Sequence, residues 1–304
     1  MVWHQHSGKL EEQAYSQLSK DLLALNLDSR CLETLPETIG ELRNLQVLSA
    51  YDNQMKNVSE KFWELIDLKI LNLAGNQFES LSENIGNLTN LEMLDLGHNQ
   101  LKKVPQNLGF LSALRYLYLS NNHLKFLPDS MQALVSLVYL NITDNQFISL
   151  PEWIGSLKNV IELRLYNNQL ESLPASIENC SKLSELHLMR NRIKQLPENF
   201  GKLTDLRVLD LEKNQIQEVP NSFVELNQLA HLNLRFNNVS ELPDDFGKLH
   251  SLRFLDLRAN QLETLPKSVL QLVNLEKLDL RWNRFADYPE WLKELESKGC
   301  MIHI

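Results

Sequence analysis

The sequence repeats itself every 23 residues, and this period constrains the fold more than any other feature. The stretch Leu114–Ser136 (LRYLYLSNNHLKFLPDSMQALVS) shows one repeat, whose positions we number as slots 1 to 23 from Leu114. All ten prolines of the chain occupy slot 15. A period of about 20–50 residues is typical of arrays in which each repeat packs against its neighbours. Slot 1 recurs in twelve repeats without insertion or deletion, at Leu22, Leu45, Leu68, Leu91, Leu114, Leu137, Val160, Leu183, Leu206, Leu229, Leu252 and Leu275.

The slots differ in the structure they predict. Apolar slots 4 and 6 alternate with slots 3 and 5, which is the pattern of a strand with one buried face. One repeat cannot bury its own leucines, so stacked repeats are expected to pair their strands in parallel around a continuous core. Slot 9 is asparagine in every repeat except the first, where it is Arg30. Its amide can donate and accept hydrogen bonds at once, so it can satisfy buried backbone groups where the chain turns.

The second part of the repeat predicts a short helical segment. Proline at slot 15 suits the first turn of a short helix or 3₁₀ segment, where its missing N–H is not needed. Slots 18 and 21 are apolar and three residues apart, so they face the core together. Glycine recurs at slot 19, where we expect it to end the segment.

Both ends of the array require caps. Leu10, Ala14 and Leu18 are spaced as one face of a helix within residues 7–19, which could cover the first repeat. After the last repeat, residues 300–304 (CMIHI) suggest a closing strand with Ile302 and Ile304 turned inward. We therefore expect an N-terminal capping helix in residues 1–21, repeats in residues 22–297 and a C-terminal capping strand in residues 298–304.

Composition excludes several classes of function. The formal net charge is -9, which argues against general nucleic-acid binding because that needs basic surface. No apolar run is long enough to span a bilayer, so no membrane insertion is expected. Three distant cysteines form no disulfide framework and indicate a reducing compartment, hence a cytoplasmic location. The chain has no phosphate-cradling glycine loop and no paired metal-ligand motif, so we predict no enzyme activity, no cofactor and no metal site.

The pattern LxxLxLxxNxLxxLPxxIxxLxx resembles that of the leucine-rich repeat family over residues 22–297. The 23-residue length and the Leu-Pro pair resemble the intracellular subclass of Ras-linked scaffolds and plant Ras-group repeat proteins. The resemblance implies an α/β solenoid, a right-handed horseshoe with a concave parallel sheet and short helical or 3₁₀ segments on the convex side. It also implies a monomeric, non-enzymatic scaffold that binds a protein partner on the concave face. The alternative is a regulator or inhibitor of a signalling enzyme or small GTPase, including a bacterial effector delivered into a host cytoplasm.

In the fold that the resemblance implies, slots 3 and 5 point into the concavity and slots 7 and 8 flank it. One predicted binding cluster occupies these slots in repeats 5 to 8. Aromatic residues and arginine are enriched at binding hot spots, although an exposed sheet face favours tyrosine without any partner. The cluster contains Tyr116, Tyr118, Tyr139, Asn141, Glu162, Arg164, Tyr166, His187, Met189 and Arg190.

A second predicted cluster lies in repeats 10 to 12, where arginine fills slot 7 in succession beside Phe236 and other aromatic residues. It could receive an acidic partner. The alternative is a ladder of surface ion pairs with the aspartates of slot 5, each worth little. The residues predicted to bind here are Arg235, Phe254, Arg258, Arg281 and Trp282.

Overall fold

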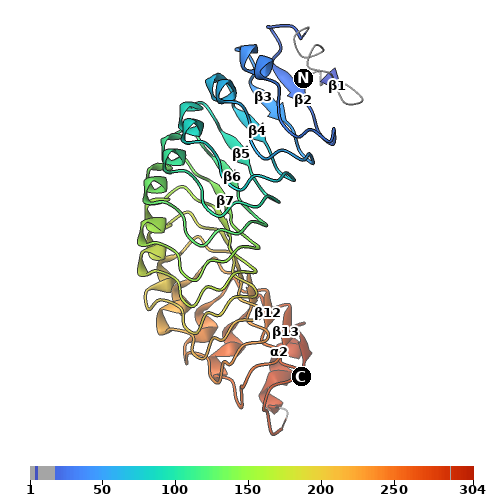
Figure 1. Cartoon of the computed structure of the whole chain (residues 1–304). Coiled ribbons are helices and arrows are strands. Elements are labelled where there is room, and N and C mark those ends of the chain that lie inside the picture. Colours follow the sequence, from blue (N-terminus) through green and yellow to red (C-terminus); the bar gives the residue numbers. More distant parts are fainter. Residues whose placement is uncertain (1–3, 6–17, 288) are drawn as a thin grey trace. The chain divides into compact units, whose positions relative to one another are not determined.

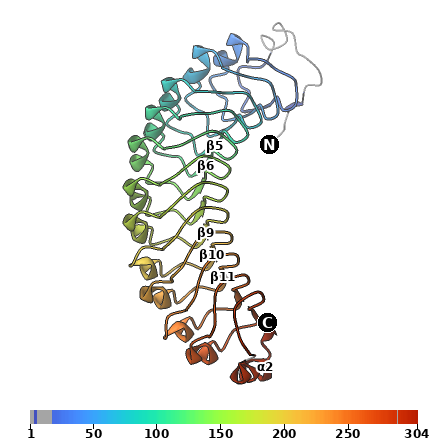
Figure 2. The same cartoon turned by 60° about the horizontal axis from the view of Figure 1, so that its bottom comes forward.

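The computed structural model describes residues 4–5, 18–287 and 289–304, and the chain divides into two compact halves, Met1–Gln146 and Phe147–Ile304. Within each half, short parallel strands lie side by side along one side and short 3₁₀ segments run along the opposite side (Figures 1 and 2). The parallel sheet with 3₁₀ connections confirms the predicted solenoid class.

The N-terminal half contains parallel strands of two or three residues joined by five-residue 3₁₀ segments. Its strands are β1 His4–Gln5, β2 Ala24–Asn26, β3 Val47–Ser49, β4 Ile70–Asn72, β5 Met93–Asp95, β6 Tyr116–Tyr118 and β7 Tyr139–Asn141. Its 3₁₀ segments are η1 Glu37–Glu41, η2 Glu60–Glu64, η3 Glu83–Asn87, η4 Gln106–Phe110 and η5 Asp129–Ala133.

The C-terminal half continues the same alternation and adds one short α-helix. Its strands are β8 Glu162–Arg164, β9 Glu185–His187, β10 Val208–Asp210, β11 His231–Asn233, β12 Phe254–Asp256, β13 Lys277–Asp279 and β14 Met301–His303. Its helical segments are η6 Glu152–Ser156, η7 Ala175–Asn179, η8 Phe200–Lys202, η9 Asn221–Glu225, η10 Phe246–Lys248, η11 Lys267–Gln271, η12 Glu290–Leu292 and α2 Lys293–Ser297.

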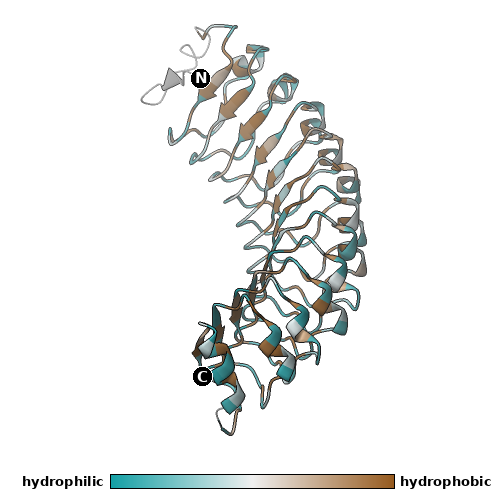
Figure 3. Ribbon diagram, turned by 180° about the vertical axis from the view of Figure 1, so that it is seen from behind, coloured by the Kyte–Doolittle hydropathy of each residue, from teal (hydrophilic) through white to brown (hydrophobic). Residues whose placement is uncertain are grey.

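The core follows the slot pattern. Strands pair at the same slot, so that Leu94 lies beside Leu117 and Leu117 beside Leu140, and all three are 0% exposed. Hydrophobic residues line the strands within each half (Figure 3). Slots 3 and 5 flank each buried leucine and point the other way, so they form a second surface, which we call the sheet face.

The slot-9 asparagines bridge neighbouring repeats as predicted. Asn122 Nδ2 lies 3.0 Å from the carbonyl oxygen of Leu96 in the preceding repeat and 3.1 Å from that of Leu119 in its own. Its Oδ1 accepts a hydrogen bond from the backbone N–H of Leu101 at 2.9 Å. The amide therefore satisfies backbone groups of two repeats at the turn, which strand pairing leaves without partners.

The residue at slot 8 takes a left-handed backbone conformation in every repeat, which we did not predict. The φ angles lie between 52° and 66°. This conformation turns the chain so that the next residue, the slot-9 asparagine, enters the core. The residues are Ser29, Asp52, Gly75, His98, Asn121, Asp144, Asn167, Arg190, Lys213, Phe236, Ala259 and Trp282.

Proline and glycine act differently from the predictions for them. Pro36 stands one residue before η1, with φ -62°, and its carbonyl accepts the first hydrogen bond, from Ile39 N–H at 3.1 Å. Glycine at slot 19 does not end the segment: Gly40 lies inside η1, and a Cβ there would lie 2.6 Å from the carbonyl oxygen of Lys61 in η2. Glycine is needed because adjacent 3₁₀ segments approach closely, so the expectation that it stops the helix was wrong.

The ends of the array are only partly described. The predicted capping helix of residues 7–19 lies almost entirely outside the described residues, whereas His4 and Gln5 pair with Leu25 and Asn26 in β2. At the other end, β14 pairs with β13, and Ile302 lies opposite Leu278. Ile304 is 47% exposed, so the prediction that it turns inward was wrong. Among the described residues, no helix has the length and apolar character needed to cross a bilayer.

Candidate interaction surfaces

The sheet face of the N-terminal half carries the predicted tyrosines. Tyr116 and Tyr118 come from β6, and Tyr139 comes from β7. The rings of Tyr118 and Tyr139 lie 4.9 Å apart between centroids at an interplanar angle of 39°, and the Arg115 guanidinium lies 5.6 Å from the Tyr116 ring centroid. All three tyrosines are half-buried, so part of each side chain remains accessible. The strands thus hold an amphipathic aromatic patch, which we call the tyrosine patch.

Asn141, the neighbour of this patch on β7, serves the fold. It is 9% exposed, and its Oδ1 accepts a hydrogen bond from Thr143 N–H at 3.1 Å. The same slot-5 contact recurs with the N–H two residues later at Asn26, Asn72, Asp95, Asp210, Asn233, Asp256 and Asp279. Asn141 therefore offers a partner little surface, and slot 5 is partly a structural position.

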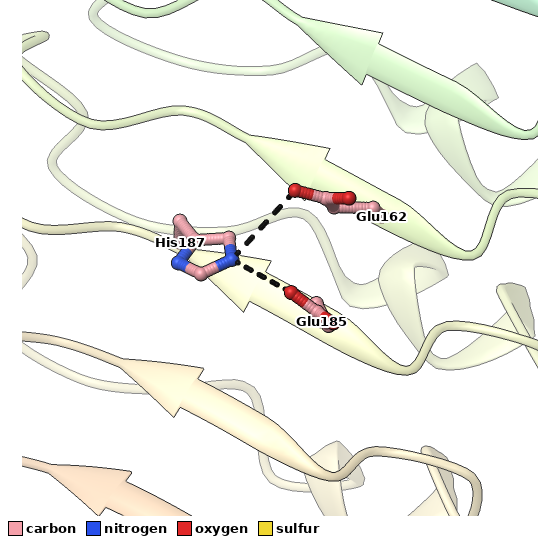
Figure 4. A group of neighbouring side chains, drawn as sticks. All are labelled: Glu162, Glu185 and His187. Carbon is pink, nitrogen blue, oxygen red and sulfur yellow. Dashed lines mark hydrogen bonds and ion pairs between the residues drawn. The ribbon is translucent and has the colours of Figure 1, made fainter.

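In the C-terminal half, β8 and β9 bring two carboxylates and an imidazole together (Figure 4). His187 Nε2 lies 3.3 Å from Glu185 Oε2 and 3.9 Å from Glu162 Oε1. One ligand atom from each residue lies within 4.8 Å of the others. Imidazole and carboxylate groups are ligands that divalent transition metals accept. Arg164 Nε lies 2.5 Å from Glu162 Oε1, so a guanidinium already neutralises one of these carboxylates.

The remaining members of the first predicted cluster surround the turns that follow β8 and β9. Tyr166 and Met189 are half-buried at slot 7, and their carbonyl oxygens accept hydrogen bonds from slot-9 asparagines. Arg190 is exposed at slot 8 with φ 53°. Of these three residues, Arg190 is the charged one, and its side chain is exposed.

The second predicted cluster forms ion pairs within the chain. Arg281 Nη2 lies 2.7 Å from Asp279 Oδ2, and Arg258 Nε lies 2.9 Å from Asp256 Oδ1 and 3.5 Å from Asp279 Oδ2. Burial acts to raise the pKa of Asp279, but hydrogen bonds from Arg281 and the charge of Arg258 outweigh it and hold the pKa below its ordinary value. Arg258 and Arg281 thus form the ion-pair ladder with slot-5 aspartates, whereas Arg235 pairs with Glu212 of the preceding repeat. An acidic partner would have to compete with these carboxylates for the arginines.

The sheet face of β10 to β13 is hollowed to roughly 390 Å³. His231 and Phe254 stack in it with ring centroids 4.6 Å apart, beside the exposed Lys277. Burial raises the pKa of Asp210, which also lines the hollow, although the backbone N–H of Glu212 and the side chain of Asn233 act to lower it. Of these residues only Phe254 was predicted as a site, although the run of His231, Phe254 and Lys277 at slot 3 could have shown the others.

Phe236, named before only as a neighbour of the arginines, and Trp282, a predicted site residue, are both exposed aromatic residues. They are 40% and 66% exposed, and their ring centroids lie 6.3 Å apart. Lys213 Nζ lies 5.6 Å from the Phe236 ring centroid, and the Arg281 guanidinium lies 5.9 Å from that of Trp282. Both aromatics occupy slot 8, in the left-handed conformation.

Cys180 is not placed as a nucleophile. It is 0% exposed, and burial raises the pKa of its thiol to about 12, so the reactive thiolate is not populated near neutral pH. Its Sγ lies 3.4 Å from the carbonyl oxygen of Ile154. These features place Cys180 in the core.

Comparisons with known proteins agree with the fold. The profile described as "Leucine rich repeat" matches residues 66–124, 89–147 and 181–239, and one described as "Leucine-rich repeat region" matches residues 225–298. A leucine-rich repeat protein of Leptospira interrogans is 31% identical with a TM-score of 0.69, and the match covers 98% of this chain and 88% of that one. A comparison with curated proteins gave no match.

Two further structures are similar. The plant peptide hormone receptor RGFR1 in complex with RGF2 is 25% identical with a TM-score of 0.66, and the match covers 93% of this chain. This chain spans 53% of the receptor's length. An internalin from Listeria monocytogenes is 22% identical with a TM-score of 0.69, covering 97% of this chain and 88% of that one, and shows the fold alone.

Proposed function

Because the chain belongs to the leucine-rich repeat family, whose fold is generally a scaffold for protein–protein interaction, we propose that it is a non-enzymatic module binding a protein partner on its concave sheet face. The observation that carries this proposal is the tyrosine patch, where the rings of Tyr118 and Tyr139 lie 4.9 Å apart on the sheet face and remain partly accessible. Tyrosine and arginine bury much area while keeping a polar end, as binding hot spots require.

The rest of the assignment follows from the sequence. We propose that the protein belongs to the intracellular 23-residue subclass, acts as a cytoplasmic monomer and uses Glu162, Arg164 and His187 as further contacts. All three cysteines are free thiols, which supports a reducing compartment. The receptor RGFR1, solved in complex with RGF2, is an example of a similar structure holding a partner.

The test is capture of the partner by wild type and by Tyr118→Ala with Tyr139→Ala. The double variant should lose at least about 2 kcal/mol of binding free energy, because it removes two hot-spot side chains together. Its thermal midpoint should fall by only a few degrees, since both rings are half-exposed. His123→Ala with Lys125→Ala, two exposed residues beyond β6, is the control and should bind as wild type does.

Two outcomes would redirect the proposal. If the tyrosine variant binds normally and the control variant does not, the partner uses the turn side. If the captured partner is an enzyme or a small GTPase and this protein reduces its activity, then this protein acts as a regulator and not as a scaffold.

A further inference from the structure

In the C-terminal half, slot 8 places bulky side chains on a left-handed backbone. The left-handed region is easily reached by glycine, asparagine and aspartate, whereas a bulky side chain there is an outlier. In the N-terminal half the slot contains such residues, including Asp52, Gly75 and Asn121. In the C-terminal half Phe236 has φ 56° and Trp282 has φ 62°. Bulky residues held in sparsely populated conformations tend to mark functional sites.

The two aromatics meet because the residue between them is small. Ala259 occupies slot 8 of the intervening repeat, and the ring centroids of Phe236 and Trp282 lie 6.3 Å apart. The rings are 40% and 66% exposed, so they form a small apolar platform open to solvent. Neither ring belongs to the core, and the backbone of their turns is held by slot-5 and slot-9 side chains such as Asp279 and Asn237.

Exposed cations follow the line of the platform at slots 8 and 10. From Arg190 to Arg284, every charged residue at slots 8 and 10 is a cation, and all of them are exposed. In residues 4–5, 18–287 and 289–304, no carboxylate lies within ion-pair distance of Arg190, Arg192 or Arg284. We call these residues the turn strip: Arg190, Arg192, Lys213, Phe236, Ala259, Trp282 and Arg284.

The turn strip is continuous. Slot-8 N–H groups donate to slot-7 carbonyls of the next repeat, from Arg190 to Glu212 at 2.8 Å and from Lys213 to Arg235 at 3.0 Å. Phe236 donates to Arg258 and Ala259 to Arg281, both at 2.9 Å. With repeats roughly 4.8 Å apart, the strip from Arg190 to Trp282 spans about 19 Å, the length of about six extended residues.

We propose that the turn strip binds a linear acidic peptide segment whose apolar side chain packs on Phe236 and Trp282 above Ala259. Its carboxylates then face Arg190, Arg192 and Lys213 on one side and Arg284 on the other. This site is distinct from the tyrosine patch and involves none of its residues, so each proposal can fail without the other.

The observations favour a peptide over single-stranded nucleic acid. Aromatic residues with nearby cations can also stack bases, but carboxylates lie directly beside this platform. Glu212 lies 3.5 Å from Lys213 Nζ, and Asp279 lies 2.7 Å from Arg281. Such carboxylates repel a phosphate backbone, whose charge recurs at every nucleotide, whereas a peptide can place its acidic residues over the exposed cations and an uncharged residue beside Glu212 and Asp279.

The test uses fluorescence anisotropy with a labelled seven-residue peptide of four glutamates, one leucine and two glycines. Wild type should bind it, and replacing the leucine by glycine should weaken binding about tenfold, as expected for burying one leucine side chain. Phe236→Asn with Trp282→Asn should weaken the leucine peptide about tenfold and leave the glycine peptide unchanged. Because asparagine suits the left-handed turn, this variant should not lower the thermal midpoint.

The matched control is His98→Asn with Asp144→Asn, which places asparagine at slot 8 of the N-terminal half and should bind as wild type does. Arg190→Gln with Arg284→Gln should weaken both peptides. The proposal is overturned if wild type fails to bind the leucine peptide at about millimolar concentration, or if the aromatic variant binds it as wild type does. It is also overturned if a lysine version of the peptide binds equally well, or if a twelve-nucleotide thymidine strand binds more tightly through the same residues.

Discussion

Adjacent slot-9 asparagines should be energetically coupled, because each pair shares a carbonyl. Asn122 Nδ2 approaches the oxygens of Leu96 at 3.0 Å, Leu119 at 3.1 Å and Ser120 at 3.2 Å. Each of these oxygens has a second donor: Asn99 for Leu96, Asn145 for Leu119 and His98 N–H for Ser120. The single Asn122→Ala change therefore leaves only the N–H of Leu101 without its partner.

This count sets the magnitude for single and double variants. Leaving one buried group unsatisfied costs about 1–3 kcal/mol, so Asn122→Ala and Asn145→Ala should each lower the free energy of unfolding by that amount. Together they remove both donors from the Leu119 oxygen. The double variant should therefore lose at least about 1 kcal/mol more than the sum of the singles.

The assay is a double-mutant cycle measured by urea unfolding, with a second cycle as control. Asn76 and Asn122 are two repeats apart and share no carbonyl, since Asn76 Nδ2 contacts only the oxygens of Ala50, Leu73 and Ala74. That pair should be additive within about 0.5 kcal/mol. His123→Ala, at an exposed position next to Asn122, should change stability by less than about 0.5 kcal/mol. Additive behaviour of Asn122 with Asn145 would refute the shared-carbonyl account.

Three further predictions concern other parts of the repeat. Gly247→Ala should destabilise by about 1–3 kcal/mol, because its Cβ would overlap the carbonyl oxygen of Ser268; Val224→Ala at the same slot should cost less than about 1 kcal/mol in the same thermal unfolding assay. Asp210→Asn should raise the free energy of unfolding at pH 7, since a carboxyl with a raised pKa destabilises the fold above its ordinary pKa. The stability difference between the variant and wild type should shrink when urea titrations are repeated at lower pH. Ellman's reagent should modify only the exposed Cys31 in the folded protein and all three thiols in denaturant. The reason is that burial raises the pKa of Cys180 to about 12 and that of Cys300 to about 11. Rapid reaction of Cys180 in the native protein would contradict its core position.

The fold could be predicted because each repeat has the same pattern of apolar and exposed slots. Alternating slots 3 to 6 predict short strands, which the structure places at Tyr116–Tyr118 and its equivalents. The slot-9 amide has one chemically sensible use in a tight turn, and the structure shows it at Asn122. Repetition removed the ambiguity that a single three-residue strand would have had.

Features that depend on three-dimensional neighbours could not be read in the same way. A glycine at a helix end and one at a close approach look alike in a sequence, and Gly40 proved to be the second kind. The alternating pattern placed slot 5 on the accessible sheet face, but Asn141 Oδ1 accepts a hydrogen bond from the backbone N–H of Thr143. The sequence left open whether the slot-7 arginines pair with slot-5 aspartates or with a partner, because the pairing of Arg258 with Asp256 and Asp279 depends on side-chain rotamers, which the period does not specify.

Hydrogen bonds of the slot-5 and slot-9 side chains stabilise the left-handed turn, so the slot-8 side chain is available for binding. In the repeat of Phe236, Asn233 Oδ1 accepts the slot-7 N–H at 3.2 Å, and Asn237 Nδ2 donates to the slot-6 and slot-7 carbonyls at 2.9 and 3.4 Å. The backbone of the turn is therefore fixed by residues on either side of Phe236, whose own side chain contributes no hydrogen bond. A position whose conformation is imposed by its neighbours can carry an unfavourable residue at a cost of about 1–3 kcal/mol. Because the N-terminal half keeps favourable residues such as Asn121 and Asp144 at this slot, the unfavourable ones of the C-terminal half call for an explanation outside the fold, and a bound partner supplies it.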